Sequence, residues 1–118
     1  MRNFRQLTIW KKGIELTKAI YRITKKLPED EKFGLCSQMR RSAVSISSNI
    51  AEGCSRNSDL EYKRFLEIAI GSSFELETQL IIAHEIGFIE MEETNNLQKD
   101  IVGLQRQISS LINRLKGK

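Results

Sequence analysis

The sequence predicts an all-α protein, an antiparallel four-helix bundle with up-down-up-down topology. Apolar residues recur at spacings of three and four along the chain, strand-like alternation is absent, and Pro28 is the only proline. A chain of 118 residues can bury one hydrophobic core, so we expect a single domain over residues 1–118. Helices joined by connections of a few residues favour antiparallel neighbours.

The first two helices are expected at about residues 7–26 and 35–52. In the first, the core face carries Ile9, Leu16, Ile20 and Ile23. The helix ends before Pro28, because proline disfavours a helical conformation in the preceding residue. The second helix is expected to stop at Gly53, which accepts the left-handed conformation found after helix ends.

The last two helices are expected at about residues 59–86 and 91–115. Ser58 and Glu61 form a capping-box pattern at the start of the third, and Gly87 followed by Phe88 marks its end. The fourth has a heptad row made of Leu97, Ile101, Leu104, Ile108, Leu111 and Leu115.

Charge is distributed unevenly along the chain. Residues 1–41 hold 11 basic and 4 acidic residues (+7), residues 42–100 hold 4 and 11 (−7), and residues 101–118 hold 4 basic residues and no acid (+4). Basic ends around an acidic middle are typical of a nucleic-acid surface or of complementary edges that meet in an oligomer.

No motif with catalytic or metal-binding spacing occurs in the sequence. The only histidine, His84, has Ile81 where a di-iron site needs glutamate, so we interpret Glu77 and Glu85 as solvated charges. Phosphate loops, nucleophile elbows and paired-cysteine zinc spacings are missing. We therefore expect no enzyme activity, no catalytic residue, no cofactor and no metal.

The two cysteines are expected to be reduced and buried, in a cytoplasmic protein. Cys36 and Cys54 have no paired spacing, and residues 1–4 lack the apolar segment of a signal peptide. The longest apolar run is residues 80–83, which is too short to span a membrane.

A second periodic pattern on the second helix is polar. We call it, together with two residues of the third helix, the polar seam: Gln38, Ser45, Asn49, Glu52, Ser72 and Glu75. One interpretation is a hydrogen-bonded network that fixes helix register, and the other is a contact for a ligand or nucleic acid.

Basic residues follow one face of the first helix. This basic stripe consists of Lys11, Lys18, Arg22 and Lys25. With Arg40 and Arg41 it is the candidate nucleic-acid-binding set, although such a stripe is also typical of a solvated face or of one edge of a head-to-tail ring.

Three runs on the second and third helices have a distinctive sequence. Residues 38–46 are QMRRSAVSI, residues 48–53 are SNIAEG, and residues 69–76 are AIGSSFEL. These runs resemble the four-helix-bundle family of 23S ribosomal RNA intervening-sequence proteins. The resemblance covers nearly the whole chain. It implies a bacterial cytoplasmic protein that forms a ring-shaped homo-oligomer, with a pentamer favoured, and that is linked to structured RNA or DNA. A related group, the accessory variability proteins of diversity-generating retroelements, is basic and works with nucleic acid.

Two functions follow as hypotheses. The first is a noncatalytic oligomer that binds nucleic-acid phosphates through its basic helices. The second is a structural or adaptor protein whose charges serve ring assembly and whose partner is another protein. No membrane partner is expected.

Overall fold

The computed structural model describes residues 2–117, which form four long helices and two short 3₁₀ segments. The long helices are α1 (Thr8–Thr24), α2 (Leu35–Cys54), α3 (Asp59–Glu85) and α4 (Met91–Lys116). The short segments are η1 (Phe4–Gln6) and η2 (Glu29–Glu31). Each long helix begins and ends within two residues of the expected bounds, and the described residues contain no strand, which confirms the all-α fold.

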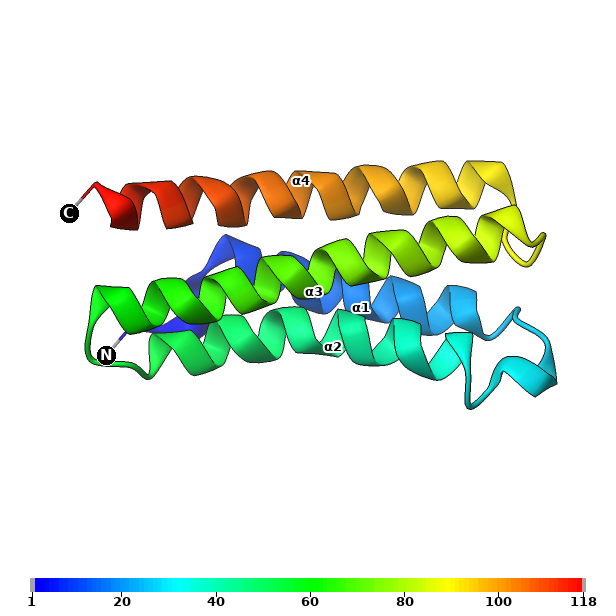
Figure 1. The fold of residues 1–118 in the computed structure, drawn as a ribbon, viewed down its shortest axis with the longest axis horizontal. Helices are drawn as coiled ribbons and strands as arrows, with labels where there is room; N and C mark the ends of the chain where they lie inside the picture. The colour runs from blue at the N-terminus through cyan, green and yellow to red at the C-terminus, as the bar shows by residue number, and fades with distance from the viewer. Residues whose placement is uncertain (1, 118) are drawn as a thin grey trace.

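The helices form an elongated up-down-up-down bundle measuring 46 × 23 × 20 Å (Figure 1). Helix α3 lies between α2 and α4, and α1 lies behind α3 in this view (Figure 1). Consecutive helices are antiparallel neighbours, so α1 and α4 lie next to each other on the remaining side of the bundle.

The core is formed by apolar side chains of all four helices, and it includes the predicted row of the first helix and most of the predicted row of the fourth. The least accessible side chains include Ile20, Met39, Ile46, Leu66, Leu76 and Ile101. On α4 the buried row starts as the heptad predicts and ends on Ile112, while Leu111 and Leu115 are only half-buried. A straight helix drifts by about 20° per heptad against a 3.5-residue repeat, which accounts for this shift.

The two ends of α3 have the expected local structure. The Ser58 hydroxyl accepts a hydrogen bond from the Glu61 backbone N–H at 3.1 Å. At the other end Gly87 has φ +90°, and the Phe88 N–H donates to the Ala83 carbonyl at 2.9 Å. This left-handed glycine is the stop that the sequence predicts.

The prediction for Gly53 was wrong. Gly87 is the only residue of 2–117 with positive φ, and Gly53 lies inside α2, which runs on to Cys54. A Cβ atom on Gly53 would lie 2.8 Å from the Phe65 Cβ and 3.3 Å from the Tyr62 carbonyl oxygen. Glycine is needed there because α3 comes too close for a side chain.

Candidate nucleic-acid interface

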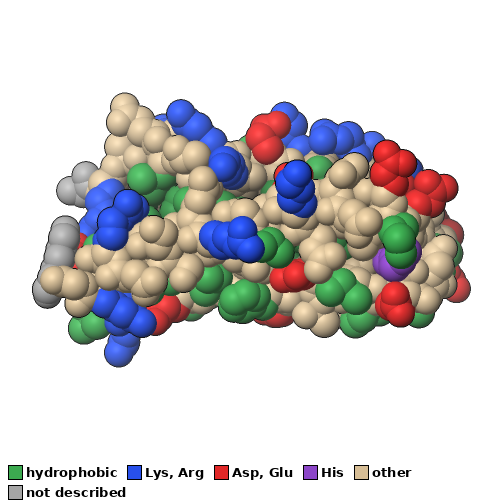
Figure 2. All heavy atoms as spheres, turned by 90° about the horizontal axis from the view of Figure 1, so that it is seen from above, with side chains coloured by type: hydrophobic (Ala, Val, Ile, Leu, Met, Phe, Trp, Pro, Cys, Tyr) green, Lys and Arg blue, Asp and Glu red, His purple; other side chains and the backbone are tan. Residues whose placement is uncertain are grey.

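The basic stripe is fully on the surface of α1. Lys11, Lys18, Arg22 and Lys25 are all exposed. Basic side chains follow the edge of the molecule on the α1 side, at the top of Figure 2. Lys18 pairs with Glu15 at 3.2 Å, whereas no carboxylate of residues 2–117 lies within ion-pair distance of the other three. The stripe therefore leaves positive charge uncompensated.

The two α2 arginines of the candidate set differ from each other. The Arg40 Nε donates to the Thr24 hydroxyl at 2.8 Å, and its guanidinium lies 4.5 Å from the Tyr21 ring centroid. Arg40 thus fastens α2 to the end of α1, whereas Arg41 is exposed. Both border an open hollow of about 590 Å³ that is also lined by Ser45, Ser72 and Glu75.

Half of the polar seam forms one connected chain of hydrogen bonds. The Asn49 side-chain amide donates to the Ser45 carbonyl at 2.8 Å and to the Ser45 hydroxyl at 2.9 Å. The Ser45 hydroxyl lies 2.9 Å from the hydroxyl of buried Ser72. This chain links α2 to α3 through side chains.

The other seam residues lie outside this chain. Gln38 and Glu75 are exposed, and Glu52 pairs at 2.7 Å with Arg56, which lies just past the end of α2. Three of the six seam residues therefore form a network, and the structure does not bring the other three into it.

A groove between α1 and α4 was missed by the sequence analysis. It encloses about 900 Å³ and has basic residues on both walls, Lys12 and Arg22 from α1 and Lys99 and Arg106 from α4. Lys99 and Arg106 are seven residues apart and so share a face of α4, but periodicity does not reveal the distance between two helices.

Glu77 is not the solvated charge that the sequence suggested. Its two carboxylate oxygens accept hydrogen bonds from Gln98 at 3.0 Å and from Gln105 at 2.9 Å. These bonds join α3 to α4. His84 has a similar structural contact, since its Nδ1 lies 2.8 Å from the Ile89 carbonyl oxygen. Within residues 2–117 no three metal-ligating side chains gather into a site.

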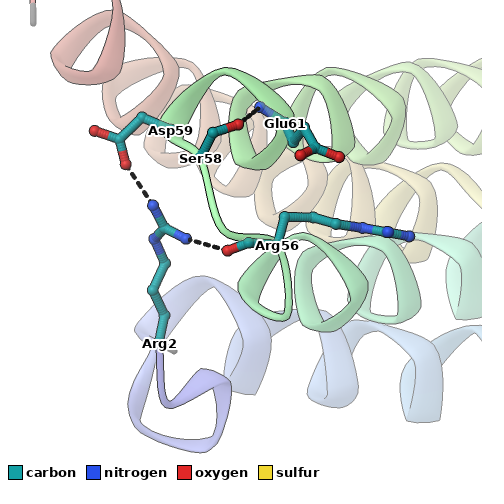
Figure 3. A network of polar contacts seen from close by, with 5 residues as sticks. All are labelled: Arg2, Arg56, Ser58, Asp59 and Glu61. Atoms are coloured by element: carbon teal, nitrogen blue, oxygen red, sulfur yellow. Dashed lines mark hydrogen bonds and ion pairs between the residues drawn. The ribbon is translucent and has the colours of Figure 1, made fainter.

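Arg2 fastens the start of the chain to the turn between α2 and α3 (Figure 3). Its guanidinium pairs with the Asp59 carboxylate, donates to the Arg56 carbonyl at 3.1 Å and lies 4.1 Å from the Tyr62 ring centroid.

Two buried ionisable groups lie beside Arg2. Burial, together with the neighbouring Cys54, raises the pKa of Tyr62 to about 12. Burial also raises the pKa of the Cys54 thiol, against a hydrogen bond to Tyr62 that lowers it.

The outer face of α3 is unusually apolar for a surface. Its exposed apolar side chains are Leu60, Ile68, Phe74, Ile81, Ile82 and Ile86. Phe74 and Ile86 keep 51% and 55% of their area accessible, so these residues are outside the core of the bundle. Large contiguous apolar patches on a protein surface mark interaction sites.

Comparisons with known proteins agree on one family. The family model of the 23S rRNA-intervening sequence protein matches residues 5–110. A crystal structure from Bacteroides thetaiotaomicron VPI-5482, described as a protein with unknown function from the S23 ribosomal protein family, is 25% identical with a TM-score of 0.83. The match covers 89% of this chain and 98% of that one. No curated protein matches the chain. None of the described helices is both long and apolar enough to cross a membrane.

Proposed function

This chain belongs to the family of 23S rRNA-intervening sequence proteins, and we propose that it is a noncatalytic homo-oligomer that binds structured RNA or DNA. The observation that carries the proposal is the basic stripe, with Lys11, Lys18, Arg22 and Lys25 exposed together on one side of α1. The family resemblance favours a pentamer, and the lack of catalytic motifs supports a binding role. We place the protein in the cytoplasm.

The outer face of α3 supports self-association. Burial of apolar surface drives protein association, and this face offers six apolar side chains that the monomer leaves in water. Phe74 lies towards α4, where it borders a hollow with Ile70 and Arg106, so the apolar surface extends to the α3–α4 side. In a homo-oligomer, a second copy of the chain would cover this apolar face.

Binding through the basic stripe would neutralise phosphates without reading base sequence. Lysine and arginine contacts with phosphates position a protein on nucleic acid but carry no sequence information. Single-strand binders stack bases on rows of aromatic side chains. Here the exposed aromatics Tyr21, Phe33 and Phe74 lie apart, on α1, in the connection before α2 and on α3, which favours a helical backbone over a single strand.

Filter binding of the native protein to a hairpin RNA and to duplex DNA at about 50 mM salt tests the proposal, because low salt strengthens electrostatic binding. We expect retention of at least one of them at micromolar protein. The double variant Lys11→Gln, Lys18→Gln should weaken binding to all sequences alike and lower the salt slope by roughly one unit per lost contact. Lys32→Gln with Lys63→Gln removes the same charge away from α1 and is the matched control.

The alternative function is an adaptor whose charges assemble the ring. It is favoured by the exposed carboxylates Glu67, Glu75 and Glu85, which lie on the outer side of α3 among the apolar residues. In that arrangement the basic stripe of one subunit would face these carboxylates of the next. If neither the RNA nor the DNA is retained, the binding proposal is wrong and the adaptor replaces it.

A further inference from the structure

The α1–α4 groove is lined by residues between Lys12 and Arg22 on α1 and between Asn95 and Arg106 on α4. At one end the Lys26 ammonium pairs with the Glu93 carboxylate at 2.6 Å and connects the two helices. Beyond this pair the helices separate around the space of about 900 Å³, whose apolar lining includes Leu16, Ala19 and Val102. A Cβ atom built on Gly103, which also lines the groove, would have no neighbour within 4 Å.

The charges that line the groove are mainly positive. Four cations border it against two carboxylates, Glu15 and Asp100, which leaves a balance of +2. Glu15 is already paired with Lys18, which lies outside the lining. The four cations, Lys12, Arg22, Lys99 and Arg106, have no ion-pair partner among residues 2–117. Unpaired like charges on facing walls repel each other unless an anion lies between them.

The cations are spaced along the groove. Lys12 and Arg22 are ten residues apart on α1, which corresponds to about 15 Å along the helix. Lys99 and Arg106 are seven residues apart on α4, or about 10 Å. A nucleic-acid strand carries one phosphate per nucleotide, so more than one phosphate of the same strand could lie within this length.

We infer that the α1–α4 groove binds the phosphodiester backbone of a structured nucleic acid, with Lys12, Arg22, Lys99 and Arg106 contacting phosphates. This inference rests on the proposed function and adds the contact site to it. Arg22 is the only residue shared with the basic stripe. Lys11, Lys18 and Lys25 lie beside the groove on the same side of α1 and contact further phosphates of the same nucleic acid, as the proposed function states.

The double variant Lys99→Gln, Arg106→Gln tests the groove without touching α1. Both side chains are exposed on α4, and glutamine is nearly as good a helix former as lysine or arginine, so the fold should be retained and a thermal melt checks it. The native protein and the variant are titrated with a hairpin RNA and a duplex DNA of matched sequence between about 50 and 200 mM salt. We expect the salt slope to fall by roughly two units in the variant, and to stay at the native value in Lys32→Gln with Lys63→Gln.

The outcomes separate the inference from the proposed function. If the native protein binds and the α4 variant keeps the native slope, the groove assignment is wrong and the proposed function stands. If the native protein binds neither probe, both are wrong. If the salt slope of the α4 variant falls for both probes, the groove contacts the sugar-phosphate backbone that RNA and DNA share. If the slope falls for one probe, the groove binds that kind of nucleic acid. Competition by polyglutamate that equals competition by the hairpin RNA would overturn the assignment in favour of an acidic protein segment.

Discussion

The side of the bundle around α2 and the side formed by α1 and α4 use small residues in opposite ways. At the crossing of α1 and α2, a Cβ atom on Gly13 would collide with the Ser47 hydroxyl oxygen, and a Cβ atom on Gly53 would collide with the Phe65 Cβ of α3. Gly103, on the α4 side, has no atom within 4 Å of the same position. The residues around α2 are therefore used in contacts between helices. On the open α1–α4 side, the cations remain available to bind an anion.

The largest effect is expected from Gly53→Ala. The new methyl group would collide with the Phe65 Cβ and approach the Tyr62 carbonyl, so the α2–α3 contact must open. Overpacking of this kind costs about 1–3 kcal/mol, which outweighs the better helix propensity of alanine. Urea unfolding followed by circular dichroism measures it. A free energy of unfolding equal to the native value would show that α2 and α3 are not closely packed there.

Tyr62 should make the same region sensitive to alkaline pH. Its pKa is about 12 in the folded protein, while in the unfolded chain it ionises near the usual tyrosine value of about 10. The unfolded state therefore binds fewer protons between these pH values, and the stability contributed by Tyr62 is lost as pH rises from about 10 to 12, on the order of 2 kcal/mol. Urea unfolding at pH 8, 10 and 11 should show a steeper loss in the native protein than in Tyr62→Phe. If the free energy of unfolding falls equally with pH in the native protein and in Tyr62→Phe, the phenol is not buried as described.

Substitutions in the seam network should have unequal effects on stability. Ser45→Ala removes the partner of the buried Ser72 hydroxyl, and an unsatisfied buried group costs about 1–3 kcal/mol. Asn49→Ala should cost less, about 1 kcal/mol, because the Ser45 hydroxyl keeps Ser72 as a partner. Thermal melts rank the two variants. An Asn49→Ala melting temperature equal to the native one would favour a ligand-binding role for Asn49.

The smallest effect, with the opposite sign, is expected from Gly103→Ala. Alanine in an exposed helix interior is more stable than glycine by roughly 0.5–1 kcal/mol, and the groove has room for the methyl group. The same substitution thus destabilises at Gly53 and stabilises at Gly103. Destabilisation at Gly103 in the native assembly would show that another chain packs into the groove.

Features set by local sequence could be predicted, and features set by distances between helices could not. The helix ends at Ser58 and Gly87 depend on neighbouring residues, so their patterns were sufficient. Gly53 was misassigned because its role depends on Phe65, which belongs to another helix. For the same reason the sequence located the stripe on α1 but neither the groove beside it nor the Gln98 and Gln105 bonds to Glu77.

The outer face of α3 completes the comparison, because it is the apolar surface that neither side of the bundle covers. We assign this apolar face to contacts between copies of the chain, and the basic side formed by α1 and α4 to contacts with nucleic acid. Assembly through apolar side chains should resist salt, since screening weakens only charge interactions. Assembly through the basic stripe, as in the adaptor alternative, should weaken as salt rises.

Light scattering of the native protein at micromolar concentration, in low and in moderate salt, tests this division most directly. We expect a particle whose mass is a multiple of the 13.6 kDa chain mass, with five copies favoured, and the same mass in both salts. A 13.6 kDa particle in both salts would contradict self-association, and an assembly that dissociates in moderate salt would contradict the apolar interface.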